Sequence, residues 1–380
     1  YISLDSGWHH ATVNNVEVFY KGYCDTESML DIVDEFVDDP VPRYRGNFGI
    51  IIVQNNRLAV THDIARAFPL NIDNLGFLTN LTKANSHESV WADRYVVYNG
   101  TEVEYEFFDP YTELNYNFDE KISLQSCALE IKRILDEKVQ YLHTTDLPIN
   151  LYLSGGLDTT LLYAYAKYHL DAENIEYNIL NYEHYHYNKF LQKNHSNLKK
   201  EFAVYGQMHS FRDPCVLLSG APGDESMFRG PYAASLWCAF KNIDLLQELE
   251  FGDYYHKKHF SKSETQNFIN SNYSGRNQIL QQYPTYELLS KQLINIFVND
   301  HQMWHLNETV TWTPFKDPRI LELVLRLNDE DLLLQILDGK LSKALVTMYD
   351  PVGLRILSDY KNHDSYSNFK NDPFLDKLFE

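Results

Sequence analysis

The sequence predicts an α/β protein with two parts: a β-rich domain over residues 1–118, and a parallel α/β domain that ends in helices over residues 119–380. Three observations support this fold class. Short apolar runs bounded by Asn, Asp and Gly fill the first part and are typical of strands joined by tight turns. Apolar residues recur at helical spacing after Asp119. A strand, a glycine turn and a helix then follow one another, which is how a parallel α/β sheet begins.

The first domain is expected to consist mainly of hairpins. Strand-like runs occur in the segments NNVEVFYKGY, NFGIIIVQNNRLAV and DRYVVYNGTEVEYEFF, where turn residues separate the apolar stretches. The segment LDIVDEFVDD has apolar residues at helical spacing instead. We therefore expect one helix among these strands.

The second domain is expected to open with a helical segment whose apolar stripe comprises Ile122, Cys127, Ile131, Ile134, Leu135, Val139 and Leu142. The run INLYL that follows is too short for a helix and predicts a buried strand. After the turn SGGLDTT, the segment LLYAYAKYHL predicts a helix, and IEYNIL and CVLL predict two further strands. The last ~100 residues are expected to be mostly helical.

Composition narrows the class of function. The chain has 33 basic and 53 acidic residues, a formal net charge of −20 and a pI near 5.1. This balance argues against binding to a nucleic-acid backbone, which requires a basic face. No run approaches the ~20 apolar residues of a membrane span, and no secretory signal precedes the first strand. We expect a cytoplasmic protein with small-molecule or peptide partners, and buried thiols at Cys24, Cys127, Cys215 and Cys238.

The first glycine turn, Ser154 to Thr160, has the composition of an anion-binding loop. Backbone N–H groups, a Ser hydroxyl and a helix N-terminus together form a cradle for phosphate oxygens, and Gly155 and Gly156 allow a close approach. Asp158 would repel a bare phosphate, so its presence favours a Mg²⁺ ion held between carboxylate and phosphate. The alternative is a loop whose Asp and Thr merely cap the next helix.

A second turn repeats this pattern after the CVLL strand. Ser219 to Glu225 again places small residues after a strand, including Gly220 and Gly223, with Asp224 at the end. Two strand ends of one parallel sheet, each carrying an Asp, are what a magnesium pyrophosphate site requires. The alternative is a Gly-rich helix N-terminus in which acidic residues favour the helix dipole.

The two turns resemble the synthetase domain of the asparagine synthetase family. Its pyrophosphatase loop has the pattern SGGxDS and its later strand ends in LSGxGxDE followed by FxGY; the corresponding segments here are INLYLSGGLDTT and VLLSGAPGDESMFRG. The segment Pro314-Phe315-Lys316-Asp317 is similar to the family's PFLD turn. The first domain is similar to its GxFA...D..G..PL pattern at Arg45-Gly46-Asn47-Phe48, Asp63, Arg66, Pro69 and Leu70. The matching segments are short and separated, but they span nearly the whole chain and occur in the same order as in the family.

This resemblance implies an ATP-dependent, AMP-forming carbon–nitrogen ligase that uses ATP and Mg²⁺. In the family a substrate carboxylate attacks the α-phosphate of ATP, pyrophosphate leaves, and an amine or ammonia converts the acyl-adenylate to an amide. It implies an adenine nucleotide α-hydrolase-like second domain and a degenerate N-terminal-nucleophile-hydrolase-like first domain. The implied nucleotide-binding residues are Leu153, Ser154, Gly155, Gly156, Asp158, Thr159, Gly220 and Gly223, and the implied metal ligands are Asp158 and Asp224.

The resemblance also suggests catalytic lysines. Lys361 lies where the family's terminal RxK motif would fall, and Lys343 resembles an earlier lysine of a KxxLR stretch. Such a lysine would stabilise charge in the adenylation and amide-forming steps. We favour Lys361, while either residue could instead be a solvated surface lysine.

Two departures from the family pattern alter the expected substrate. Glutaminase members begin with a catalytic Cys, whereas this sequence begins with Tyr1 and has no Cys before Cys24. We therefore expect no glutamine hydrolysis in cis, and either a separate ammonia source or an amine on the substrate itself, as in β-lactam synthetases and lasso-peptide cyclases. The family's Glu before the PFLD turn is displaced here to Glu308, which disfavours asparagine synthesis.

Three rival interpretations remain. His184 and His186 could suggest a metal site, but residues two apart face opposite sides of a strand. Another class of ATP pyrophosphatase, such as a sulfur-transfer or nucleobase-modifying enzyme, shares the first loop but not the first domain. A catalytically inactive nucleotide-binding pseudoenzyme is the rival outside the enzyme class.

Overall fold

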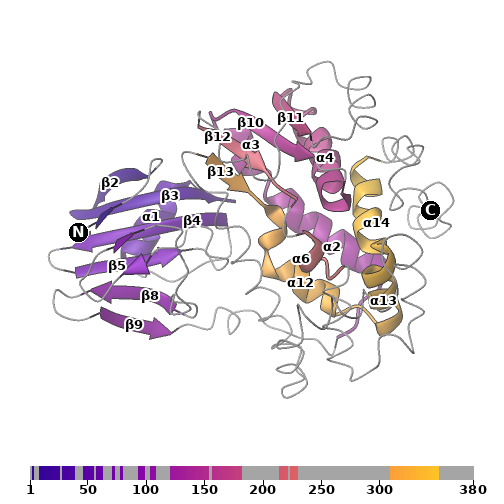
Figure 1. Cartoon of the computed structure of the whole chain (residues 1–380), viewed down its shortest axis with the longest axis horizontal. Coiled ribbons are helices and arrows are strands. Elements are labelled where there is room, and N and C mark those ends of the chain that lie inside the picture. The colour runs from indigo at the N-terminus through magenta and orange to yellow at the C-terminus, as the bar shows by residue number, and fades with distance from the viewer. Residues whose placement is uncertain are drawn as a thin grey trace, which may run out of the picture.

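The computed structural model of the chain describes residues 2–3, 8–25, 28–38, 46–54, 57–62, 71–72, 78–79, 93–98, 103–107, 120–153, 156–181, 214–220, 223–229 and 309–350. These residues form a mixed α/β structure with one antiparallel and one parallel main sheet, which lie side by side in Figure 1. The predicted α/β class is confirmed at this level. The predicted boundary at residue 118 falls outside the described residues, so the division into two domains stays a prediction.

The N-terminal sheet has six antiparallel strands in the order β2-β3-β4-β5-β8-β9. Their bounds are β2 His9–Val13, β3 Val16–Cys24, β4 Gly46–Gln54, β5 Arg57–His62, β8 Asp93–Tyr98 and β9 Val103–Phe107. Asn14 and Asn15 both have positive φ, the conformation that a two-residue hairpin requires between β2 and β3. A small separate sheet consists of β1 (Ile2–Ser3), β7 (Leu78–Thr79) and β6 (Asn71–Ile72). The predicted hairpins are confirmed.

The one predicted helix of this region is α1 (Met29–Asp38). Its residues Ile32, Val33 and Phe36 are buried in one cluster with alternate residues of β3 and β4, which are Val16 and Val18 in β3 and Phe48, Ile50 and Ile52 in β4. Gly46 opens β4 with a φ of +150°, and a Cβ there would lie 2.2 Å from the backbone oxygen of Tyr23. Only glycine fits this position, so the glycine of the GxF-like segment has a structural explanation.

The second sheet has four strands, all parallel, in the order β11-β10-β12-β13. Their bounds are β10 Ile149–Leu153, β11 Tyr177–Asn181, β12 Cys215–Leu218 and β13 Thr309–Trp312. The three predicted strands are confirmed. The sequence analysis missed β13, because its four residues favour a strand but form too short a run to stand out, and the segment becomes a strand by pairing with β12.

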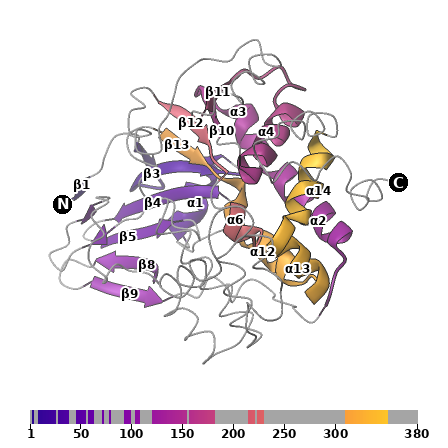
Figure 2. The ribbon, with the colours of Figure 1, turned by 45° about the vertical axis from the view of Figure 1, so that its right-hand side comes forward.

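Helices cover this sheet and form most of the C-terminal part that is described (Figures 1 and 2). They are α2 Leu124–Glu137, α3 Gln140–Thr144, α4 Leu157–His169, α6 Gly223–Ser226, α12 Pro318–Leu325, α13 Asp329–Asp338 and α14 Lys340–Tyr349, with a 3-10 turn, η4, at Pro314–Lys316. The predicted apolar stripe over 122–142 is buried, but it is shared by two helices, because the chain leaves α2 at Lys138. In Figure 2, α14 lies beside α4 and α2, and the three share one core.

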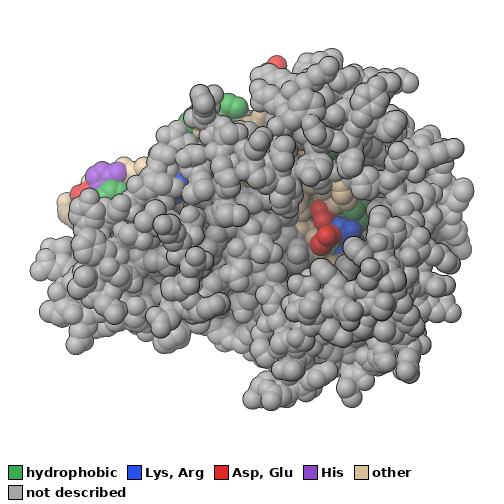
Figure 3. Space-filling model, in the orientation of Figure 1, with side chains coloured by type: hydrophobic (Ala, Val, Ile, Leu, Met, Phe, Trp, Pro, Cys, Tyr) green, Lys and Arg blue, Asp and Glu red, His purple; other side chains and the backbone are tan. Residues whose placement is uncertain are grey.

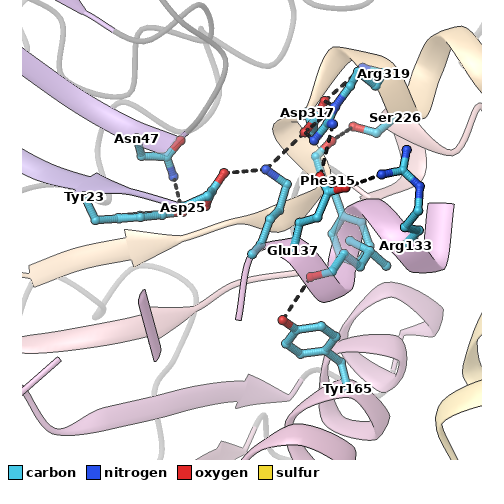
Figure 4. Close-up of polar contacts among 12 residues, drawn as sticks. Tyr23, Asp25, Asn47, Arg133, Glu137, Tyr165, Ser226, Phe315, Asp317 and Arg319 are labelled. Atoms are coloured by element: carbon cyan, nitrogen blue, oxygen red, sulfur yellow. Dashed lines mark hydrogen bonds and ion pairs between the residues drawn. The ribbon is translucent and has the colours of Figure 1, made fainter. Parts of the chain in front are cut away.

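A buried ionic cluster joins the two sheets where β3 ends and α12 begins (Figure 4). The Nζ of Lys138, after α2, pairs with the carboxylate of Asp25 and lies 3.1 Å from that of Asp317. The Lys138 and Asp25 side chains are each 5% exposed and the Asp317 side chain is fully buried. Burying charges at this depth is tolerable only because each carboxylate meets a cation.

The pKa values of Asp317 and Lys138 reflect the pairing, whereas burial raises the pKa of Asp25 in spite of the charge of Lys138. Burial alone would raise the pKa of Asp317, but the charges of Lys138 and Arg319 outweigh burial and hold that pKa below its ordinary value. Burial likewise opposes the charge of Lys138, yet Asp25 and Asp317 raise the lysine pKa above its usual range. Lys138 and Asp317 are therefore charged in the folded protein at neutral pH.

Asn47 makes the second polar connection between the sheets. Its amide nitrogen donates to the backbone oxygen of Thr311 at 2.9 Å, to the hydroxyl of Thr313 at 3.0 Å and to the hydroxyl of Tyr23 at 3.1 Å. Tyr23 in turn stacks on Tyr141 with ring centroids 4.3 Å apart. These contacts fix the N-terminal end of β4 against β13.

The structure also bears on the predicted burial of the cysteines and on membrane-spanning helices. Cys24, Cys127 and Cys215 are buried thiols, as expected, and Cys238 lies outside the described residues. Among the helices that the structure describes, none combines the length and the apolar character that a membrane crossing needs.

Candidate functional site

The candidate site lies where β10 and β12 end. The two strands are parallel neighbours, with Leu151 opposite Leu218, so their carboxyl ends reach the same edge of the sheet. Beyond β10 the chain enters α4, which carries Asp158 in its first turn. Beyond β12 it enters α6, which contains Asp224. The expectation that two strand ends of one parallel sheet each deliver an Asp to one edge is confirmed.

The two carboxylates meet at one guanidinium group. The Nη2 of Arg229 lies 2.9 Å from each carboxylate oxygen of Asp158, and it also binds the Oδ1 of Asp224. The Asp158 and Arg229 side chains are 16% and 19% exposed, whereas that of Asp224 is 55% exposed. Figure 3 shows acidic side chains beside a basic one within a hollow of this face, over α6.

Glycines make this close approach possible. A Cβ on Gly223 would lie 2.4 Å from the Cγ of Asp158, and one on Gly220 would lie 2.8 Å from the backbone nitrogen of Thr159. Gly339, between α13 and α14, has a φ of +64°, and a Cβ there would lie 2.9 Å from the Cδ of Arg229. The loop after β12 is therefore packed directly on the start of α4, and the stem of Arg229 passes against Gly339.

The pKa of Asp158 is raised well above its ordinary value. Burial is the largest cause, and the neighbouring carboxylate of Asp224 adds to it, while the charge of Arg229 acts in the opposite direction. Two carboxylates this close repel each other unless a cation or a proton lies between them. The raised pKa means that Asp158 takes up a proton more readily than a free carboxylate does, so the pair can accommodate either a proton or a cation.

The hydroxyl groups at the start of α4 are engaged with the helix itself. Thr159 and Thr160 both donate to the backbone oxygen of Gly156, at 3.1 and 2.9 Å. The Thr159 side chain is nearly buried, at 7% exposed. A phosphate role for Thr159, as the resemblance implies, would therefore require the hydroxyl to rotate, because its single proton is donated to Gly156 and phosphate oxygens accept hydrogen bonds.

Of the other predicted site residues, two are buried in the described structure and the rest lie outside the described ranges. Leu153 is fully buried and its side chain belongs to the hydrophobic core, so it offers no face on which adenine could stack. Lys343 is 1% exposed, which excludes the alternative of a solvated surface lysine. It lies one helical turn after Gly339, the glycine against which Arg229 packs, and its backbone nitrogen donates to the backbone oxygen of Gly339. The predicted residues that lie outside the described ranges are Ser154, Gly155, Glu308, Lys361, His184 and His186.

The carboxylates of Asp158 and Asp224 fit Mg²⁺ only if phosphate or water oxygens complete its coordination and Arg229 moves away from them. Mg²⁺ prefers one or two carboxylates supplemented by phosphate oxygens and water, and Asp158 and Asp224 supply two. Within the described ranges, no group of three or more His, Cys, Asp or Glu side chains could hold a metal on its own. The space between the two carboxylates contains the Arg229 guanidinium, so a metal and this guanidinium cannot occupy it together.

Arg229 is the residue that the sequence analysis missed. It lies five residues after Asp224, just beyond α6, and its backbone nitrogen donates to the oxygen of Asp224 at 2.7 Å. A spacing of five residues lies outside the i,i+3 and i,i+4 pairs that face each other on a helix, so the sequence did not indicate the contact with Asp224. The contact with Asp158 depends in addition on the pairing of β10 with β12.

The PFKD segment has a structural role in the described fold. Asp317 is the N-cap of α12, where its carboxylate accepts from the backbone nitrogen of Arg319 at 3.0 Å. It is also the buried partner of Lys138. The likeness of this segment to the family's PFLD turn therefore has an explanation in capping and charge pairing.

Gly223→Ala is expected to destabilise the protein by about 1–3 kcal/mol, because the added methyl group overlaps the short side chain of Asp158. Urea unfolding measures this loss. In an Asp158→Gly background the same change should cost less, by a coupling energy of about 1 kcal/mol or more. An equal cost in both backgrounds would show that Asp158 is not the obstacle.

No protein-family model matches the chain, and no curated protein matches it. The site must therefore be interpreted from its own geometry and chemistry.

Proposed function

We propose that the protein is an ATP-dependent ligase that adenylates a carboxylate, releases pyrophosphate and joins the acyl group to an amine. The observation that carries the proposal is the convergence of Asp158 and Asp224 at the carboxyl edge of adjacent parallel strands. In open α/β sheets ligands bind at that edge. A pair of carboxylates there, beside glycines and the N-terminus of α4, suits a magnesium-bound phosphate chain.

The proposal includes a finer fold assignment. The parallel sheet with its helices would be an adenine nucleotide α-hydrolase-like domain, and the antiparallel sheet would be a degenerate N-terminal-nucleophile-hydrolase-like domain. Support comes from the strand-turn-helix unit of β10 and α4 and from the six-stranded antiparallel sheet that precedes it. The order of these two parts along the chain agrees with the sequence resemblance.

In this proposal the protein positions and neutralises the triphosphate. Asp158 and Asp224 would hold Mg²⁺, which supplies positive charge to the leaving pyrophosphate when bound. The backbone of Gly156, Gly220 and Gly223 would allow close approach, and the N-terminal end of α4 would favour the anion. Lys343, buried one turn beyond Gly339, and Lys361 are the candidates to stabilise charge in the later steps.

The proposed substrates are a small-molecule or peptide carboxylate and an amine. The amine would belong to a separate ammonia source or to the same substrate molecule, in which case the reaction is a cyclisation of the β-lactam synthetase or lasso-peptide cyclase type. The acidic net charge of −20 favours such partners over nucleic acid. A cytoplasmic location accords with this chemistry and remains part of the proposal.

A second candidate function is nucleotide binding without turnover. The observation that favours it is the contact of Arg229 with both carboxylates, since a resident guanidinium already supplies the charge that a metal would bring. Such a protein would bind the nucleotide as a structural switch.

Incubation with ATP, Mg²⁺ and pools of candidate carboxylates and amines separates the two candidates. The ligase should release AMP and pyrophosphate in equal amounts, and only when an accepted carboxylate is present. Release of ADP would contradict adenylation. Binding of ATP without turnover in any pool would favour the second candidate.

A further inference from the structure

We propose that Arg229 and a divalent cation compete for the same pair of carboxylates, so that the site is closed to metal until a nucleotide draws Arg229 away. This inference rests on the proposed function for the identity of the incoming ligand. It concerns the order in which cation and nucleotide occupy the site.

The first step of the argument is geometric. A single nitrogen of Arg229 contacts both oxygens of Asp158 and also reaches Asp224. Any ion coordinated by both carboxylates would have to lie where this nitrogen now lies. Cation and guanidinium therefore exclude each other by volume as well as by charge.

The second step concerns why Arg229 stays there. Its stem packs against Gly339, where an added Cβ would lie 2.9 Å from the Cδ of Arg229 and 2.9 Å from a methyl carbon of Leu157. The segment 223–229, which contains α6 and Arg229, is fixed as well, because Ser226 donates to the backbone oxygen of Phe315 and Gln335 donates to that of Met227 at 2.7 Å. Arg229 is thus pre-positioned, which lowers the entropic cost of the bridge.

The third step is the exchange itself. The Asp224 side chain is 55% exposed, so its bond to Arg229 can be replaced by water or by a metal ligand at modest cost. An incoming triphosphate offers the guanidinium several anionic oxygens in bidentate geometry, which Arg binds well. Release of the two carboxylates then provides the oxygen ligands for a cation that arrives with the phosphates.

Binding of Mn²⁺, followed by the loss of its free electron paramagnetic resonance signal, tests the competition without turnover. Wild-type protein without nucleotide should bind Mn²⁺ weakly. Arg229→Met, which keeps the length of the stem but removes the charge, should bind one Mn²⁺ at least about tenfold more tightly. Arg229→Lys should remain weak, because the ammonium still occupies the pair.

Two further variants locate the bound ion and guard against misfolding. Adding Asp224→Asn to Arg229→Met should remove the gain in affinity, which would assign the ion to this pair. Thermal unfolding of each variant shows whether it folds. If Arg229→Met does not fold, the comparison is made on wild-type protein: α,β-methylene-ATP should raise its affinity for Mn²⁺ by at least about tenfold, after subtraction of the Mn²⁺ that the analogue binds in the absence of protein.

The inference fails if Arg229→Met binds Mn²⁺ no better than wild type, or if wild-type protein without nucleotide already binds it as tightly as with the analogue. These outcomes are separate from the fate of the ligase proposal. Competition for Mn²⁺ without AMP formation under any condition would keep this inference and reject the ligase. AMP formation with unchanged Mn²⁺ binding in Arg229→Met would do the reverse.

Discussion

Asp158→Asn is expected to lower the exchange of labelled pyrophosphate into ATP by about 100-fold or more, because it removes a preorganised charge from the developing pyrophosphate. The change is nearly isosteric, and Arg229 keeps its contact with Asp224, so the packing against Gly223 should persist. The measurement is the exchange rate in the presence of an accepted carboxylate, with circular dichroism as the test of folding.

Asp146→Asn is the matched control for this experiment. Asp146 is an exposed aspartate just before β10, at the opposite end of the same strand from Asp158. It undergoes the same change of charge without touching the carboxyl edge of the sheet, so exchange should stay near the wild-type rate. Exchange that persists in Asp158→Asn, or that falls equally in both variants, would refute the metal role assigned to Asp158.

Lys138→Met is expected to cost about 3–5 kcal/mol of folding free energy, because it removes the ammonium group that pairs with Asp25 and one of the two cations that pair with Asp317. The Lys138 side chain is 5% exposed, so water cannot replace the lost charge. Urea unfolding at neutral pH measures the difference from wild type.

Arg133→Met is the control, because Arg133 lies on α2 and pairs with Glu130 and Glu137 while 59% exposed. Its loss should cost under about 1 kcal/mol, as for most surface ion pairs. A small effect of Lys138→Met would show that the buried cluster does not hold the two sheets together.

The pH dependence of the Lys138→Met defect follows from the same charges. In wild-type protein the lowered pKa of Asp317 contributes stability at neutral pH that is lost as the pH falls through and below 3.8, the ordinary value. Without Lys138 the buried carboxylates favour protonation, so acid stabilises the variant relative to wild type. The difference between the two proteins should therefore shrink from neutral pH toward pH 3.8. A difference that grows on acidification would contradict this account.

Much of the secondary structure was predictable because it depends on local patterns. The apolar runs of β3, β4, β10 and β12 and the helical spacing of α1 and α4 are set by which residues must face a core. The exception depends on residues that are distant in the sequence. The stripe over 122–142 continues through Lys138, although the chain turns there to bury that lysine between two aspartates.

The candidate site was predictable only in part. The sequence indicated that Asp158 and Asp224 follow strands, since each stands a few residues after an apolar run. It could not indicate that Leu153 points into the core, that Lys343 is buried, or that Asp317 serves as a cap and charge partner. Each of these depends on which element packs opposite the residue.

By itself, then, the sequence determined the α/β class, the strand-turn-helix unit around the first glycine loop, and the pair of aspartates that could bind a cation. Only the tertiary structure decided that β10 and β12 are neighbours, that β13 completes the sheet, and that Arg229 stands between the two carboxylates. The physical reason is that periodicity and turn chemistry act over a few residues. The cation partner of Asp158 comes instead from 71 residues further along the chain, and is fixed by strand pairing and by the space left at Gly223 and Gly339.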